Sequence, residues 1–171
     1  ALEEYITQLQ QIQGETTTME PTERASDLPP AERNNMYSAS PPMTIDQSKS
    51  YQATIVTQKG NIVVDLAASD APQTVNNFVY LAEQGFYDNL TFHRVESQPG
   101  FSLIQGGDPN GNGISDDGIA TIQDEFTDTN ENDRGTIAMA NLGEDHPNSG
   151  CSQFFINVVD NNYLDPLHPV F

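Results

Sequence analysis

Apolar and polar residues alternate from residue 51 onward, and this period of two is typical of β-strands with one buried face. The alternation predicts strands at 51–57 and 62–66, joined by a turn in which Gly60 can take a positive φ. Strands outnumber helices in the pattern, so it favours a mainly β domain, built as a barrel. Further strand-like segments, separated by loops rich in Gly, Asn and Asp, recur at 91–95, 101–105, 136–140 and 153–159.

One segment with helical periodicity interrupts the strands at 70–84. Asp70 is placed to cap its first turn together with Gln73, Pro72 suits that turn, and Gly85 suits its end. We therefore expect one amphipathic helix in the domain. Its apolar face consists of Val75, Phe78, Val79 and Ala82.

The chain before residue 51 has a different composition and divides into two regions. Residues 15–50 contain few apolar residues and the pairs Pro29-Pro30 and Pro41-Pro42, so we predict a flexible, extended linker that acts as a spacer. Residues 51–171 form the domain. In residues 1–14 the apolar side chains recur at helical spacing, which predicts an amphipathic helix segment with a stripe of Leu2, Tyr5, Ile6, Leu9 and Ile12.

Charge and cysteine content exclude several classes of partner and site. Six basic residues against 25 acidic ones give a formal net charge of -19, and such a surface repels phosphate backbones, so nucleic acid is excluded as a partner. No run reaches the roughly 18 apolar residues of a bilayer-spanning helix. The single cysteine, Cys151, excludes an internal disulfide framework, and three histidines argue against structural zinc.

Arg94 is one of three cations in residues 51–171, with Lys59 and Arg134. It lies inside a predicted strand that is followed closely by a Gly-Gly turn. An ion pair with one of the many carboxylates is the simplest interpretation of such a charge. The surrounding residues supply a second interpretation.

The doublet Phe154-Phe155 lies in a predicted strand, where consecutive side chains point to opposite faces. One ring can fill the core, and the other must line something else. If the second ring lies near Arg94, Leu103 and Gln105, the four residues form an apolar pocket with a few convergent polar groups. That combination is the usual form of a ligand site.

The motifs of residues 51–171 occur in the order found in one known family and together resemble the cyclophilin-type peptidyl-prolyl cis-trans isomerases. The resemblance implies a closed eight-stranded antiparallel barrel with capping helices, the first at 70–84. The family continues past the position of Phe171, so we expect a barrel incomplete at the C-terminus that folds poorly or associates, and a monomer when complete. The motifs are Phe92-His93-Arg94-Val95, Gly100-Phe101, Ile104-Gln105-Gly106-Gly107-Asp108-Pro109, Met139-Ala140-Asn141, Ser152-Gln153-Phe154-Phe155-Ile156, and Tyr163-Leu164-Asp165 with His168 and Phe171.

The resemblance also implies the site. Arg94 matches the family's catalytic arginine, and Tyr163 stands where many relatives have Trp, which implies that cyclosporin binding is weakened more than turnover. The other matches are substrate-binding positions: Gln105 and Gln153 in the polar groove, Phe155 as the floor of the proline pocket, Ala140, Asn141 and Leu142 along the peptide edge, and Leu164 and His168 as the far wall.

The segment 96–99 makes the chain between Arg94 and Gln105 longer than the usual family spacing. We assign Phe101 and Leu103 as apolar wall residues with Ser102 bulged between them, and the alternative register places Ser102 on the wall.

No cofactor and no metal are expected. The loop 108–113 has oxygen side chains at alternate positions and a Gly at the sixth, as in a calcium loop. Its twelfth position is Ile119, where a bidentate Glu is needed, so calcium is only an alternative. His93 has no paired nucleophile or carboxylate dyad, and Cys151 has no cationic activator nearby in sequence.

These residues predict an isomerase that accelerates X-Pro bond rotation in proline-containing peptides and in unfolded or folding proteins. Rotation requires no covalent step, and a guanidinium aimed at the proline nitrogen stabilises the twisted transition state alone. The alternative is an interaction module that binds proline segments with little turnover. The amphipathic stripe of residues 1–14 and the polar linker after it would suit a domain held away from a membrane surface, which favours an extracytoplasmic location over the cytosol. A salt-rich habitat also selects acidic surfaces.

Overall fold

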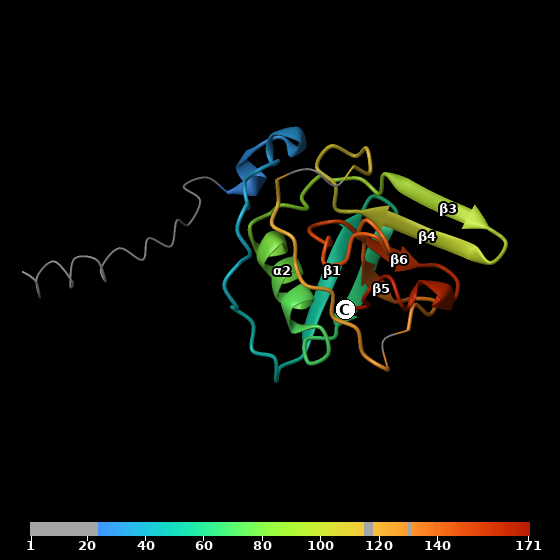
Figure 1. The fold of residues 1–171 in the computed structure, drawn as a ribbon. Coiled ribbons are helices and arrows are strands. Elements are labelled where there is room, and N and C mark those ends of the chain that lie inside the picture. Colours follow the sequence, from blue (N-terminus) through green and yellow to red (C-terminus); the bar gives the residue numbers. More distant parts are fainter. Residues whose placement is uncertain (1–23, 115–117, 130) are drawn as a thin grey trace, which may run out of the picture.

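The computed structural model describes residues 24–114, 118–129 and 131–171, so the helix predicted at 1–14 lies outside the described residues. Its strands form two antiparallel sheets, and one α-helix packs beside them (Figure 1). Within the described residues, no helix combines the length and apolar character needed to cross a bilayer.

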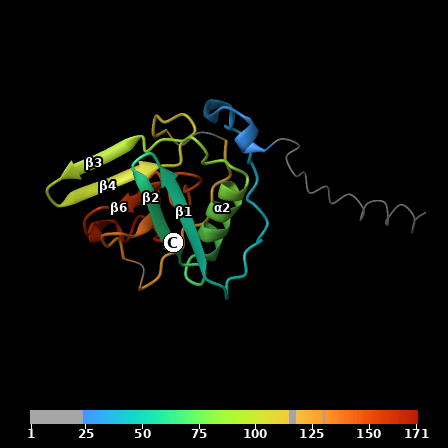
Figure 2. The ribbon, with the colours of Figure 1, turned by 180° about the vertical axis from the view of Figure 1, so that it is seen from behind.

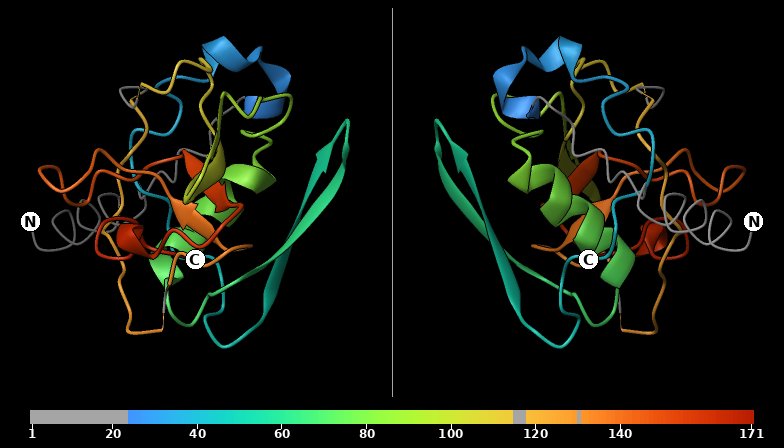
Figure 3. Two further views of the ribbon diagram at one scale, coloured as in Figure 1. Left: turned by 90° about the vertical axis from the view of Figure 1, so that its right-hand side faces the viewer. Right: turned by 90° about the vertical axis from the view of Figure 1, so that its left-hand side faces the viewer.

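The hairpin of β1 (Tyr51–Thr57) and β2 (Gly60–Leu66) is the first sheet, as the alternating pattern predicts. The turn closes between Thr57 and Gly60, and Gly60 has a φ of 127°, a value that glycine adopts without a steric penalty. In Figure 3 the hairpin forms a layer of its own along one side of the molecule.

The helix α2 (Pro72–Glu83) begins two residues later than the predicted cap, Asp70. The Asp70 carboxylate instead accepts a hydrogen bond from the Ser69 hydroxyl. Glu125, from a distant loop, caps the helix, because its carboxylate accepts the backbone N–H groups of Gln73 at 3.0 Å and Thr74 at 2.8 Å. The negative charge also complements the helix N-terminus.

The second sheet contains β3 (Arg94–Gln98), β4 (Phe101–Gly106), β6 (Phe154–Asn157) and β5 (Ile137–Met139), in that spatial order. All three pairings are antiparallel. In the described part of the chain, no strand ladder joins this sheet to the hairpin. The fold is therefore mainly β with antiparallel sheets, and closure into an eight-stranded barrel stays a prediction.

The main core lies between the inner face of the hairpin, α2 and one face of the second sheet. The Phe78 ring on α2 is 5.5 Å from that of Phe154 and 5.4 Å from that of Phe171, measured between centroids. Burial of this apolar surface holds the three layers together. Other buried members of the core are Val64, Leu66, Val75, Ile137, Met139 and Ile156.

Residues 24–45, which we call the strap, pack on the domain, so the flexible linker predicted for 15–50 is wrong over this part. The strap runs along the outer side of α2, as Figures 1 and 2 show from opposite directions. Its Tyr37 is 6% exposed, and the ring meets those of Tyr80 and Phe86 edge-on at 5.7 and 6.0 Å. Composition was misleading because a few well-placed side chains suffice to anchor the segment.

Arg33 anchors the strap through polar contacts. Its side chain is buried, and its guanidinium donates to the carbonyl oxygens of Leu28 at 2.9 Å and Phe86 at 2.8 Å. Lower down, the Asn76 side chain on α2 accepts the backbone N–H of Thr44 at 2.8 Å. The buried guanidinium of Arg33 thus has backbone partners, which removes most of the cost of burying its charge.

Candidate active site

The site residues lie on the face of the second sheet that points away from the main core. Antiparallel pairing places Arg94 opposite Gln105, Gln105 opposite Phe155 and Phe155 opposite Ala138, so these four side chains form a row across the sheet. We call this surface the Arg94 face. Its strands lie side by side in Figure 1. Phe154 points the other way into the core, as expected for the doublet.

Three contacts orient the Arg94 guanidinium. Nε donates to Oε1 of Glu96 at 3.1 Å, Nη1 donates to Oε1 of Gln105 at 3.2 Å, and Cζ lies 5.8 Å from the centroid of the Phe101 ring. Among the described residues, Nη2 has no hydrogen-bond partner, and the side chain is 48% exposed. A strong, permanently charged donor is therefore held in place with one edge available.

The two predicted glutamines extend this polar line inward. Nε2 of Gln105 donates to Oε1 of Gln153 at 2.9 Å, and Gln153 itself is buried. Gln153 pairs across the sheet with Ala140, whose N–H donates to the Gln153 carbonyl at 2.9 Å. The line from Arg94 through both amides reaches the predicted peptide edge.

An apolar cluster adjoins the row. Ser97 pairs with Ser102 in regular register, so Phe101 and Leu103 share the Arg94 face and no bulge forms. Ser102 lies on the opposite face, which resolves the alternative that placed it on the wall. The cluster consists of Leu103, Ala138, Phe155 and Val170, with Phe101, Ala140 and Leu164 packed at its margin.

The predicted far wall meets this cluster from the C-terminal loop. The His168 ring contacts Phe155 edge-on at 5.3 Å, and its Nδ1 lies 3.2 Å from the carbonyl oxygen of Met139. Burial lowers the pKa of His168, so the neutral ring is favoured. Leu164 ends the 3₁₀ turn η3 (Asn162–Leu164) and accepts the His168 backbone N–H. Tyr163 is 56% exposed, and its ring centroid is 6.1 Å from that of Phe101.

Sequence reasoning missed the buried amides that hold this far wall. Nδ2 of Asn157 donates to Asn132 at 3.1 Å, and Nδ2 of Asn161 donates to Asn157 at 2.8 Å. Asn132 in turn donates to the carbonyl of His168 at 3.1 Å and to the Asp165 carboxylate. The signal was an unusual number of Asn residues near the site, but their pairing depends on the fold.

The peptide edge, Ala140-Asn141-Leu142, leaves one backbone unit available. The Asn141 side chain is used internally, donating to the Leu167 carbonyl at 2.6 Å and accepting the Gly143 N–H at 3.0 Å. Within the described residues, the backbone N–H and C=O of Asn141 make no hydrogen bond. Leu142 is exposed beside them.

Other candidate groups lie away from this arrangement. The Asp108 carboxylate is buried and accepts the N–H groups of Asn110, Asn112 and Gly113, so its own loop saturates it. No cluster of three metal-ligating side chains occurs in the described ranges. Burial lowers the pKa of His93.

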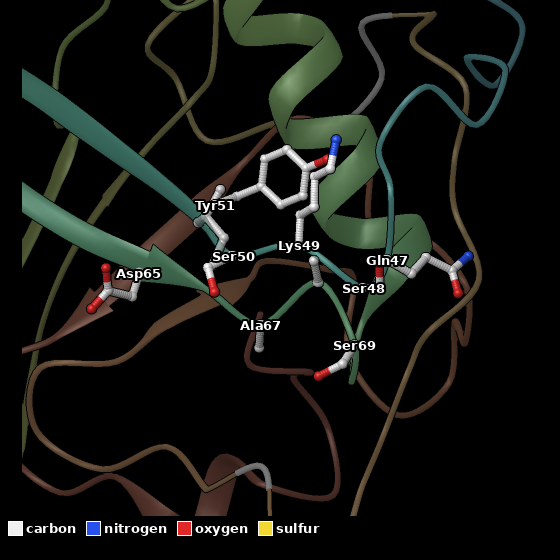
Figure 4. Close-up of a pocket in the computed structure, with 10 residues that line it drawn as sticks. Gln47, Ser48, Lys49, Ser50, Tyr51, Asp65, Ala67 and Ser69 are labelled. Carbon is white, nitrogen blue, oxygen red and sulfur yellow. The ribbon is translucent and has the colours of Figure 1, made fainter.

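A hollow between residues 47–51 and 65–69, shown in Figure 4, includes none of the predicted site residues.

Comparison with known proteins identifies this arrangement. Residues 52–171 match the family described as cyclophilin type peptidyl-prolyl cis-trans isomerase/CLD. A peptidyl-prolyl cis-trans isomerase of Helicobacter pylori is 46% identical over 124 residues, covering 72% of each chain, and one of Synechococcus elongatus is 46% identical over 120 residues, covering 70% of this chain and 77% of its own.

Solved structures agree with the sequence comparison. The crystal structure of a cyclophilin type peptidyl-prolyl cis-trans isomerase from Cryptosporidium parvum has a TM-score of 0.63 and 32% identity, covering 72% of this chain and 76% of that one. A second structure of the same protein, determined in the presence of the dipeptide Ala-Pro, has a TM-score of 0.61. The family and the isomerase activity predicted from the sequence are thus confirmed, and the chain belongs to the cyclophilin-type peptidyl-prolyl cis-trans isomerases.

Proposed function

We propose that Arg94 is the catalytic residue of this isomerase and acts without covalent chemistry. Rotation about an X-Pro bond breaks amide resonance against a barrier of about 18–20 kcal/mol. In the twisted state the proline nitrogen regains its lone pair, and a donor aimed at that nitrogen binds the transition state but not the planar ground state. The oriented guanidinium with Nη2 available is the observation that carries this assignment.

The apolar cluster is the proposed proline pocket. Phe155 and Leu103 contact the ring from below, while Phe101, Leu164 and the neutral His168 surround it. A protonated imidazole there would repel the Arg94 charge and lose its apolar contact with Phe155, so the lowered pKa of His168 suits a wall residue.

The backbone of Asn141 is the proposed anchor for the substrate chain. An extended peptide lying along this edge can accept its N–H and donate to its C=O, as a strand adds to a sheet. Gln105 and Gln153 line the adjacent surface. The pocket holds the proline ring and the Asn141 backbone holds the preceding part of the substrate chain, so rotation is confined to the X-Pro bond between them.

Non-covalent contacts are sufficient for the required acceleration. A rate gain of about 10⁵ corresponds to roughly 7 kcal/mol of transition-state stabilisation. One well-placed donor is worth about 3 to 4 kcal/mol, and fixed orientation of the substrate supplies the remainder.

The test is Arg94→Ala in a peptide isomerisation assay at low temperature, with Arg134→Ala as a matched control that removes an exposed cation elsewhere. We expect kcat/KM to fall about 10²- to 10³-fold in the first variant and to stay unchanged in the second. Peptide binding, followed by calorimetry, should be retained by both. Equal, negligible rates in the wild-type protein and in Arg94→Ala would leave only the alternative function, a proline-binding module.

The substrates of the family are proline-containing peptides, and we extend this to unfolded or folding proteins here. Cyclosporin is proposed to bind weakly, because Tyr163 presents a smaller ring than Trp at an exposed position. We also propose a monomer with a closed eight-stranded barrel for the complete domain. We also propose an extracytoplasmic location, supported by the amphipathic stripe predicted at 1–14 and the polar residues that follow it.

A further inference from the structure

The lengthened segment 96–99 forms the far end of the β3–β4 hairpin, which projects from the body of the protein in Figure 1. The extra residues continue both strands up to a turn at Gly100, which has a φ of 78°. This extension sets Glu96 opposite Leu103, two residues beyond Arg94 in the same strand. Glu96 and Arg94 therefore point to the same face.

The Glu96 carboxylate is held at both oxygens. Oε1 accepts Nε of Arg94 at 3.1 Å, and Oε2 accepts Nε2 of Gln98 at 3.3 Å. Its side chain is 26% exposed, compared with 48% for Arg94. The carboxylate is thus better fixed than a typical surface acid and lies at the margin of the Arg94 face.

This ion pair has two consequences for Arg94. Engagement of Nε sets the plane of the guanidinium, and with Gln105 at Nη1 it leaves the Nη2 edge for substrate. The carboxylate also cancels the charge of Arg94, so a cationic substrate approaching this face meets no net repulsion from it. The whole chain carries a net charge of -19, which attracts such a substrate from farther away.

We propose that Glu96 is a positioning residue for Arg94 and a specificity determinant that favours substrates with Lys or Arg next to the proline over substrates with Asp or Glu there. The proposal rests on the proposed role of Arg94. It assigns a function to the lengthened hairpin. The donor stays charged and hydrogen-bonding, while the face as a whole becomes tolerant of positive charge.

The test compares Glu96→Ala and Glu96→Gln in the full chain, with Ala-Pro, Lys-Pro and Glu-Pro peptides as substrates. Glu32→Gln, an exposed acid on the strap, is the matched control for the change in net charge. On the Ala-Pro peptide we expect Glu96→Ala to lower kcat about fivefold with little change in KM, because the guanidinium loses its orientation. Glu96→Gln should stay within about twofold, since the amide oxygen still accepts Nε.

The charge effect has a separate readout. The ratio of kcat/KM for the Lys-Pro peptide to that for the Glu-Pro peptide should fall about threefold to fivefold in both Glu96 variants, stay unchanged in Glu32→Gln, and shrink in high salt for the wild type. Circular dichroism and thermal unfolding confirm that the variants are folded.

Four results would overturn all or part of the proposal. The whole proposal is refuted if Glu96→Ala has the wild-type kcat on the Ala-Pro peptide and also keeps the wild-type ratio of kcat/KM for Lys-Pro to that for Glu-Pro. A lower kcat with an unmoved ratio refutes the specificity claim, and an equal shift in Glu32→Gln refutes its local origin. Loss of activity in Arg94→Ala alongside a wild-type Glu96→Ala would overturn this inference and leave the proposed function intact.

Discussion

Replacing Tyr37 with alanine tests whether the strap is part of the folded domain in solution. The Tyr37 side chain is 6% exposed and makes edge-on contacts with the rings of Tyr80 and Phe86. Truncating a buried aromatic residue typically costs about 3–5 kcal/mol, and the two ring contacts add to the loss of buried area. A residue in a flexible linker would change stability by no more than about 0.5 kcal/mol. We therefore expect about 3 kcal/mol less stability.

The assay is equilibrium unfolding of the full chain in urea, followed by circular dichroism. The expected result is a midpoint shifted to lower urea concentration with an unchanged slope, because the rest of the domain still unfolds as one unit. Tyr37→Phe is the matched control: it keeps the ring and should remain within about 1 kcal/mol of the wild type. If Tyr37→Ala is as stable as Tyr37→Phe, the strap does not pack on the domain, and the linker predicted from composition is restored.

Two further predictions concern the far wall. Asn157→Ala leaves Asn132 and Asn161 without their shared partner, so we expect the free energy of unfolding to fall by about 2–3 kcal/mol and KM for proline peptides to rise. Unchanged values in urea unfolding and in kinetics would show that the amides do not support the wall. For His168, burial lowers the pKa of the imidazole below 6.5 in the folded state. As pH falls, the unfolded chain therefore takes up a proton on this residue at a higher pH than the folded protein does. The contribution of the neutral His168 to the free energy of unfolding is then complete above about pH 6.5 and is lost as pH falls. In urea unfolding at about pH 7.5 and about pH 5, His168→Gln should lose less stability between the two pH values than the wild type does. An equal loss in both proteins would refute this prediction.

Local pattern predicted those parts of the fold that depend on local physics. The hairpin follows from alternation and from Gly60, and the opposite directions of Phe154 and Phe155 follow from the geometry of any strand. The ordered motifs identified the residues of the Arg94 face, and the structure brings them together. Their individual roles in substrate binding stay predictions.

Features formed by distant residues were not accessible in this way. The cap of α2 comes from Glu125 and not from the adjacent Asp70, because a carboxylate from another loop reaches the same N–H groups. The strap holds Arg33 in a buried position that composition alone disfavours, since two of its partners are the backbone carbonyls of Phe86 and Asp88, 53 and 55 residues away. The pairing of Glu96 with Arg94 depends on the register of the hairpin, which the length of the segment 96–99 alone does not determine.

The doublet in β6 has a consequence for how the strand finds its place during folding. Sliding β6 by one residue would exchange its two faces, yet a phenyl ring would still point to each side, so the aromatic pair by itself tolerates the error. The polar neighbours do not. The slip would drive Gln153 and Asn157 into a hydrocarbon interior without partners, at about 1–3 kcal/mol each, and would turn Ile156 outward. The amide side chains of Gln153 and Asn157 therefore specify the correct register of this strand. Apolar replacements at these two positions would allow the strand to pair in the wrong register even where the native contacts are kept.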